Sequence, residues 1–175
     1  GMRFSDAYAA CPICSPTRSS VMSGKYPARL NQTDWIKGMK LREPHKFKQV
    51  QDLNYLPLDE VTIAEALKSA GYTTCHVGKW HLGGEDHMPG DQGFDVNVTG
   101  NEHGSPPGYF APFGRKDAGW DKVNENADKG DYLTDLLSKR AAEFIRDSAD
   151  DPFFLYYCPY AVHTPRQAKE KYKEL

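Results

Sequence analysis

Apolar positions recur at helical spacing in two stretches of the chain. The first stretch follows Thr62 and Glu65, whose spacing is that of a capping box, and it ends before Gly71, a residue suited to stop a helix. Its expected apolar face is Ile63, Ala66, Leu67 and Ala70. A second helix is predicted from about residue 132 to 147. Its expected apolar face is Leu133, Leu136, Leu137, Ala141, Phe144 and Ile145.

Two other stretches have the composition of buried strands. Residues 72–77 are rich in β-branched and aromatic side chains, and residues 153–158 form a continuous apolar run after Pro152. Each predicted strand follows a predicted helix after a short connection. This order favours an α/β layered fold with a largely parallel sheet. Residues 37–56 and 83–119 show no sustained period and are expected to be long, irregular loops.

A further helix is predicted to begin near Pro16, because proline is tolerated in a first helical turn. Its free backbone N–H groups and the positive end of its dipole would then face residue 14, which is Cys14. One turn later, Arg18 adds a permanent charge and a fork of donors suited to a tetrahedral oxyanion. This arrangement suits a nucleophile that attacks an anionic ester.

Composition narrows the class of protein only slightly. The chain has 175 residues, the size of one domain, and 22 basic against 24 acidic residues give a net charge of −2. This balance gives no reason to expect nucleic acid or an anionic membrane as a partner. No apolar run approaches the roughly 20 residues that cross a bilayer.

The four cysteines leave a second reading open. Cys11 and Cys14 form a CxxC pair, which occurs in redox proteins and in zinc sites. Against this reading, the chain has no second CxxC, and Cys75 and His76 are adjacent, which is not an ordinary spacing for zinc ligands. A redox or zinc-binding module therefore remains a remote alternative.

Three motifs carry a resemblance to a known family. Residues 14–18 read Cys-Ser-Pro-Thr-Arg, residues 71–83 contain Gly-Lys-Trp-His at 78–81, and residues 161–165 place His163 after the second apolar strand. In this order they resemble the two signatures and the later histidine of the sulfatases. The first signature is Cys-x-Pro-x-Arg, in which the cysteine is oxidised to formylglycine. The resemblance implies an alkaline-phosphatase-like α/β fold with a mostly parallel sheet flanked by helices.

The resemblance also implies a reaction and a role for each motif residue. A sulfuric ester would be hydrolysed by hydrated formylglycine at residue 14: one hydroxyl attacks sulfur, and the other loses its proton as sulfate is expelled. Arg18 would hold the hydrate and help to order a calcium shell. Lys79 would contact the sulfate, and His81 would hydrogen-bond the hydroxyl that is deprotonated. His163 would bind the ester or protonate the leaving alcohol.

Partners and cofactors follow from the same resemblance. The expected substrate is a sulfated glycan or an aryl sulfate, bound by Lys79, His163 and His103, with Asn101 and Tyr109 as further candidates in the loop that carries His103. The expected cofactors are calcium and the formylglycine made from Cys14. Residue 14 would be the only calcium ligand within this chain. A formylglycine-generating enzyme would act during maturation, and the compartment would be periplasmic, secreted or lysosomal.

The extent of the resemblance leaves two alternatives within the same superfamily. Residues 1–175 are expected to be the central part of a sulfatase catalytic domain, with the N-terminal strand and the C-terminal part missing. The strand would carry paired calcium-binding aspartates, so an inactive fragment is one alternative. The other is a phosphate or phosphonate ester hydrolase, because phosphate and sulfate are similar tetrahedral anions.

Overall fold

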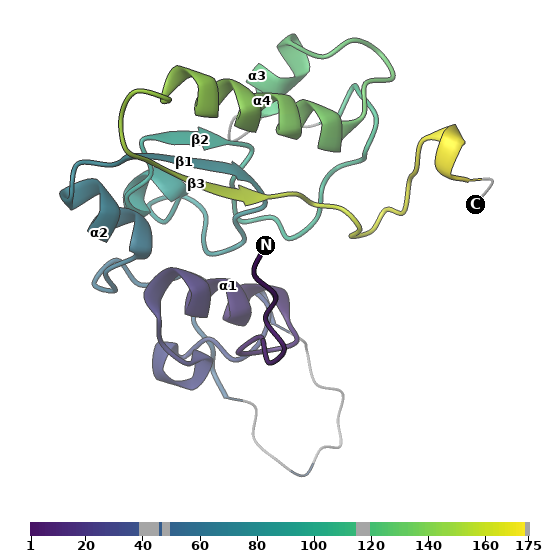
Figure 1. Cartoon of the computed structure of the whole chain (residues 1–175). Helices are drawn as coiled ribbons and strands as arrows, with labels where there is room; N and C mark the ends of the chain where they lie inside the picture. The colour runs from purple at the N-terminus through teal and green to yellow at the C-terminus, as the bar shows by residue number, and fades with distance from the viewer. Residues whose placement is uncertain (39–45, 47–49, 115–119, 174–175) are drawn as a thin grey trace.

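A computed structural model shows a parallel β-sheet covered by helices on both faces (Figure 1). It describes residues 1–38, 46, 50–114 and 120–173. In the described part of the chain the strands lie in the order β2-β1-β3, and both pairings are parallel. The strands are β1 (Thr73–Gly78), β2 (Val96–Val98) and β3 (Phe153–Cys158). The predicted parallel sheet is confirmed, and the two predicted strands agree with β1 and β3 to within one residue.

Helices α3 and α4 lie on one side of the sheet, and α1 and α2 lie on the other (Figure 1). The helices are α1 (Cys14–Ser23), α2 (Ile63–Ser69), α3 (Trp120–Glu125) and α4 (Leu133–Asp147). Short 3₁₀ turns are η1 (Pro27–Leu30), η2 (Pro89–Gln92) and η3 (Glu170–Tyr172). Among the described residues, no helix combines the length and the apolar character that crossing a membrane requires.

The ends of α2 confirm the sequence prediction, whereas its predicted apolar face is wrong. Thr62 and Glu65 form the capping box, and Gly71 follows the helix with a φ of 88°. The buried residue is Ala64, while Ile63 is 42% exposed. Ala66 and Ala70 are exposed as well, and Leu67 is only half-buried. Ala64 lies about 100° around the helix from Ile63. Packing against the core therefore buries a different side of this short helix from the one that its apolar pattern predicts.

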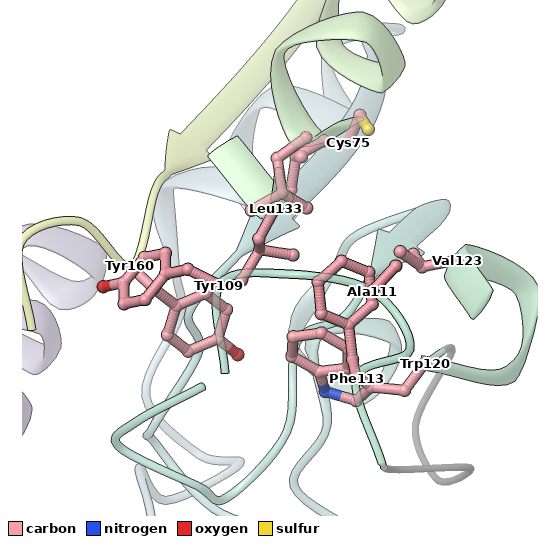
Figure 2. Close-up of a cluster of buried hydrophobic side chains, with 10 residues drawn as sticks. Cys75, Tyr109, Ala111, Phe113, Trp120, Val123, Leu133 and Tyr160 are labelled. Carbon is pink, nitrogen blue, oxygen red and sulfur yellow. The ribbon is translucent and has the colours of Figure 1, made fainter. Parts of the chain in front are cut away.

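Two apolar clusters fill the space on either side of β1. The cluster under α3 and α4 includes Leu133 and Leu137, which the helical pattern predicted as buried (Figure 2). The cluster toward α1 and α2 includes Met22, Trp80 and Phe94. The stretch 83–119, predicted as irregular throughout, contains β2, so that prediction is wrong at this strand. The two clusters hold the carboxyl ends of β1 and β3 in place, and the motif residues follow these ends.

Candidate active site

Cys14 is the first residue of α1 and is half-buried. The helix therefore begins two residues before Pro16, slightly earlier than the sequence predicts. The difference has a simple cause: Pro16 still lies in the first turn, where a missing N–H breaks no helical hydrogen bond. The first turn is closed by the N–H of Thr17, which donates to the carbonyl of Ile13 at 3.3 Å. Residue 14 is thus part of the positive end of the helix.

Arg18 ties α1 to the segment that follows β1. Its Nε donates to the carbonyl oxygen of Trp80 at 2.6 Å, and its Nη2 donates to the carbonyl oxygen of Lys79. The guanidinium carbon lies 5.5 Å from the ring centroid of Tyr156 on β3, in a cation–π contact. Arg18 therefore fixes the backbone beneath the second motif. Its predicted contact with the hydrate at residue 14 stays a prediction.

Lys79 is brought to Cys14 by a close crossing of the strand ends. Its N–H donates to the carbonyl of Cys158 at 2.8 Å. Gly78 precedes it with a φ of 106°, and a Cβ there would lie 2.0 Å from the same Cys158 oxygen. Only glycine allows this approach. The Lys79 side chain, in a residue that is only 7% exposed, lies close enough to the Cys14 side chain for the two to interact.

The electrostatics of Lys79 reflect this burial. Loss of solvent lowers the pKa of the Lys79 amine, and the Arg18 charge acts in the same direction. Interaction with the Cys14 side chain opposes that change. A buried amine beside residue 14 is suited to attract an anion, because nothing around it screens its charge as water would.

His81 lies next to this pair and is held from several sides. It is 4% exposed and has a φ of 58°, and its backbone N–H donates to the carbonyl of Asn101 at 2.8 Å. Gly104 packs so closely that a Cβ there would lie 2.4 Å from the ring carbon Cε1. Burial, aided by the charges of Lys79 and Arg18, lowers the pKa of His81 to about 3. The imidazole is therefore neutral near pH 7.

His163 differs from the other motif residues because it is exposed. Its N–H donates to the carbonyl of Tyr160 at 2.8 Å, and its carbonyl accepts from the Tyr109 hydroxyl at 3.0 Å. The smallest of the electrostatic effects on His81 comes from His163, so the two histidines lie in the same part of the molecule. The structure thus gathers Cys14, Arg18, Lys79 and His81, with His163 at the border.

His103 is the remaining candidate from the sequence. Its half-buried side chain contacts Glu102, with the Nε2 and Oε1 atoms 3.3 Å apart. Its N–H donates to the side-chain oxygen of Asn101 at 2.9 Å. The following residue, Gly104, packs on His81, so the loop does reach the site. Substrate binding by His103 stays a prediction.

The sequence pattern did not single out His76 as a site residue, yet it supports the same backbone as Arg18. It is fully buried, and its Nε2 lies 3.1 Å from the carbonyl oxygen of Lys79. Its Nδ1 lies 3.2 Å from Oδ1 of Asn97 on β2. The only available signal was its place three residues before Lys79, on an inward-facing strand. The Lys79 carbonyl is therefore held by two side chains.

The described residues do not by themselves fit a calcium ion. Calcium takes six to eight oxygen ligands, whereas the side chains around residue 14 are cationic or imidazole groups. Within the described ranges, no three His, Cys, Asp or Glu side chains come together as a metal site requires. Cys11 and Cys14 are both free thiols in this structure.

Comparisons with a family model and with curated proteins both identify sulfatases. A family model described as Sulfatase matches residues 1–175. An arylsulfatase of Hemicentrotus pulcherrimus is 33% identical, over 94% of this chain and 31% of that protein. The N-acetylgalactosamine-6-sulfatase of Rattus norvegicus is 32% identical, over 98% of this chain and 34% of that protein. This chain thus spans about a third of the length of the curated relatives it matches.

Two solved structures are similar to this chain in fold and in sequence. The protein Ps i-CgsB, solved in complex with k-i-k-neocarrahexaose, has a TM-score of 0.67 and 28% identity, covering 95% of this chain and 38% of that one. A second structure, solved in complex with its substrate D-glucosamine-2-N,6-O-disulfate, has a TM-score of 0.63 and 25% identity, covering 93% of this chain and 27% of that one.

Proposed function

We propose, from the premise that this chain belongs to the sulfatase family, that its site hydrolyses sulfate esters through a formylglycine made from Cys14. The fold is the alkaline-phosphatase-like α/β fold of that family. The observation that carries the proposal is the proximity of Cys14, at the start of α1, to the buried Lys79 amine. A nucleophile at a positive helix end beside a buried cation is what an anionic ester requires.

The chain's own residues have separate tasks in this proposal. Formylglycine, once hydrated, supplies one hydroxyl as a nucleophile and a second whose deprotonation lets sulfate leave. Lys79 attracts the sulfuryl oxygens, and Arg18 keeps the Lys79 backbone in register with α1. His81 is neutral near pH 7, so its imidazole can accept a hydrogen bond from the hydroxyl that is deprotonated. His163, on the exposed side, gives a proton to the leaving alcohol.

Substrate class, maturation and metal belong to the same proposal. Sulfated glycans are the favoured substrates, because one related protein was solved with a carrageenan oligosaccharide and another with a disulfated glucosamine. A formylglycine-generating enzyme would convert Cys14. Calcium would need oxygen ligands beyond those that the described residues bring to residue 14, and no task above depends on it. We also propose that residues 1–175 form the central part of the catalytic domain.

The direct test is the mass of the tryptic peptide of residues 4–18, from full-length protein produced together with a formylglycine-generating enzyme. We expect an aldehyde at residue 14 and an unmodified thiol at Cys11. The same preparation should release sulfate from 4-nitrophenyl sulfate faster than phosphate from 4-nitrophenyl phosphate. An unmodified Cys14, or a Cys11–Cys14 disulfide, would overturn the assignment of the nucleophile. Faster phosphate release would favour a phosphohydrolase.

A further inference from the structure

A cavity of about 450 Å³ is lined in part by His163. Its wall includes Tyr109 and Tyr132, and its rim includes Arg166 and Lys173. The volume lies in the range of sites that hold small molecules. His163 lines this cavity and interacts electrostatically with His81, so the cavity lies on the His163 side of the candidate active site.

The aromatic wall of the cavity is fixed by hydrogen bonds. The rings of Tyr109 and Tyr132 stack with centroids 5.8 Å apart and an interplanar angle of 24°. The Tyr109 hydroxyl donates to the carbonyl of His163 at 3.0 Å, and its backbone N–H donates to Oε1 of Gln167 at 2.7 Å. The Tyr132 hydroxyl donates to the carbonyl of Gln167 at 3.1 Å. The segment that carries His163 is therefore fastened to a preformed wall, which Tyr109 joins to the core beneath α4 (Figure 2).

The charge of the cavity has one sign. Arg166 and Lys173 line it, and no acidic side chain is among the described residues of its lining. Glu170 pairs with Lys173 at 2.5 Å and offsets the charge of that lysine, whereas Asp135 pairs with Lys169, so Arg166 is the main cation of the lining. Arg166 makes no ion pair within the described ranges. Its guanidinium is a fork of donors that matches a sulfate or a carboxylate.

We infer that this cavity binds a second anionic sugar unit of the substrate, on the leaving-group side of the sulfate that is cleaved. The inference rests on the proposed function, because it is the leaving alcohol at His163 that would carry the next sugar into the cavity. The partly exposed ring of Tyr132, backed by the buried ring of Tyr109, offers an apolar surface to the sugar ring, and Arg166 pairs with its anion. The anion is a sulfate or a carboxylate, since both present the oxygens that the guanidinium recognises.

The test compares three sulfated disaccharides that share the scissile ester. Their second sugar, on the leaving-group side, is neutral, carboxylated or sulfated. We would measure kcat/KM for full-length, matured protein with Arg166→Gln and with Arg146→Gln as the matched control, because Arg146 is an equally exposed arginine at the end of α4 that does not line the cavity. Arg166→Gln should lower kcat/KM roughly tenfold more for an anionic than for the neutral disaccharide, as loss of one charge-assisted contact predicts. Arg146→Gln should change none of the three.

The outcomes separate this inference from the proposed function. An equal loss on all three substrates, or no loss at all, would overturn the anionic site. A selective loss on only one of the two anionic substrates would identify that anion as the natural one. If the parent protein releases sulfate neither from these three substrates nor from 4-nitrophenyl sulfate, the proposed function fails. The cavity is then judged by calorimetric binding of the intact disaccharides, and it stands only if Arg166→Gln weakens binding of the anionic ones selectively.

Discussion

The two halves of the site are built in opposite ways. On one side, Lys79 and His81 are almost fully buried, and the backbone of Lys79 is held by Arg18 and His76. On the other side, His163 and Arg166 are exposed on a segment that follows β3. The buried half presents the same charges whatever alcohol is esterified, so it suits the sulfate group, which is the same in every substrate. The exposed half would contact the alcohol, which differs from one substrate to the next.

The largest effect should come from the centre of the buried half. Replacing the nucleophile by Cys14→Ala should reduce sulfate release on the order of 10⁴-fold or more, because nothing else in this arrangement forms the covalent intermediate. Steady-state rates with 4-nitrophenyl sulfate measure this loss. Cys11→Ala is the matched control, since Cys11 is also a half-buried free thiol of the same CxxC pair. It should keep the parent rate, and equal losses in both variants would instead indicate thiol chemistry.

The next effect tests whether the buried half is held by Arg18. Arg18→Ala removes donors from the carbonyls of Lys79 and Trp80 and should lower the free energy of unfolding by about 3 kcal/mol. Arg18→Lys keeps the charge without the fork, so we expect an intermediate loss. Urea denaturation measures both, with Arg146→Ala as the control at less than about 0.5 kcal/mol. Parent-like stability of Arg18→Ala would contradict this tie between α1 and β1.

The contribution of the exposed half to kcat should depend on the leaving group of the substrate. His163→Gln removes a proton donor, and general acid catalysis typically contributes about 10²-fold or more. A sugar alcohol is a poor leaving group and needs that proton, whereas 4-nitrophenolate leaves without it. The loss in kcat should therefore be about 10²-fold on a sulfated sugar and small on 4-nitrophenyl sulfate. If both substrates lose rate equally, His163 does not protonate the leaving group.

Local sequence signals predicted the parts of the fold that local chemistry decides. The capping pair Thr62 and Glu65, the stop at Gly71 and the run of β3 all depend on neighbours in sequence, and the structure confirms them. The buried face of α2 depends on what packs against it, so its pattern was misleading. The three residues of β2 are too short a run to stand out among glycines and prolines, and they become a strand only by pairing with β1.

The candidate site also has features that the local sequence predicts and features that depend on distant residues. The spacing of Cys14 and Arg18 on one helix and the position of Lys79 after a strand were readable, because the carboxyl ends of parallel strands share one edge. The support given by His76 was not readable. It depends on Asn97, which is 21 residues away and on the strand that the pattern missed. The Tyr109 and Gln167 contact spans 58 residues and was equally invisible.

The two halves should also differ in their response to pH. Burial lowers the pKa values of His76 and His81 to about 3 each, whereas an unfolded histidine titrates near ~6.5. Between these values the unfolded chain binds more protons, so the free energy of unfolding rises with pH. The stabilisation is complete above pH ~6.5 and is lost as the pH falls toward about 3.

Each of these two histidines should add a slope of up to about 1.4 kcal/mol per pH unit in that window. Urea denaturation at pH 4.5, 5.5 and 6.5 measures the slope. His76→Gln and His81→Gln should each remove the part of the slope that the replaced histidine contributes. A glutamine keeps a donor for the backbone but does not titrate, so the change in slope is separate from any uniform loss of stability. If neither variant flattens the curve, the two imidazoles are not buried in neutral form, and the contrast between the buried and exposed halves fails at its electrostatic basis.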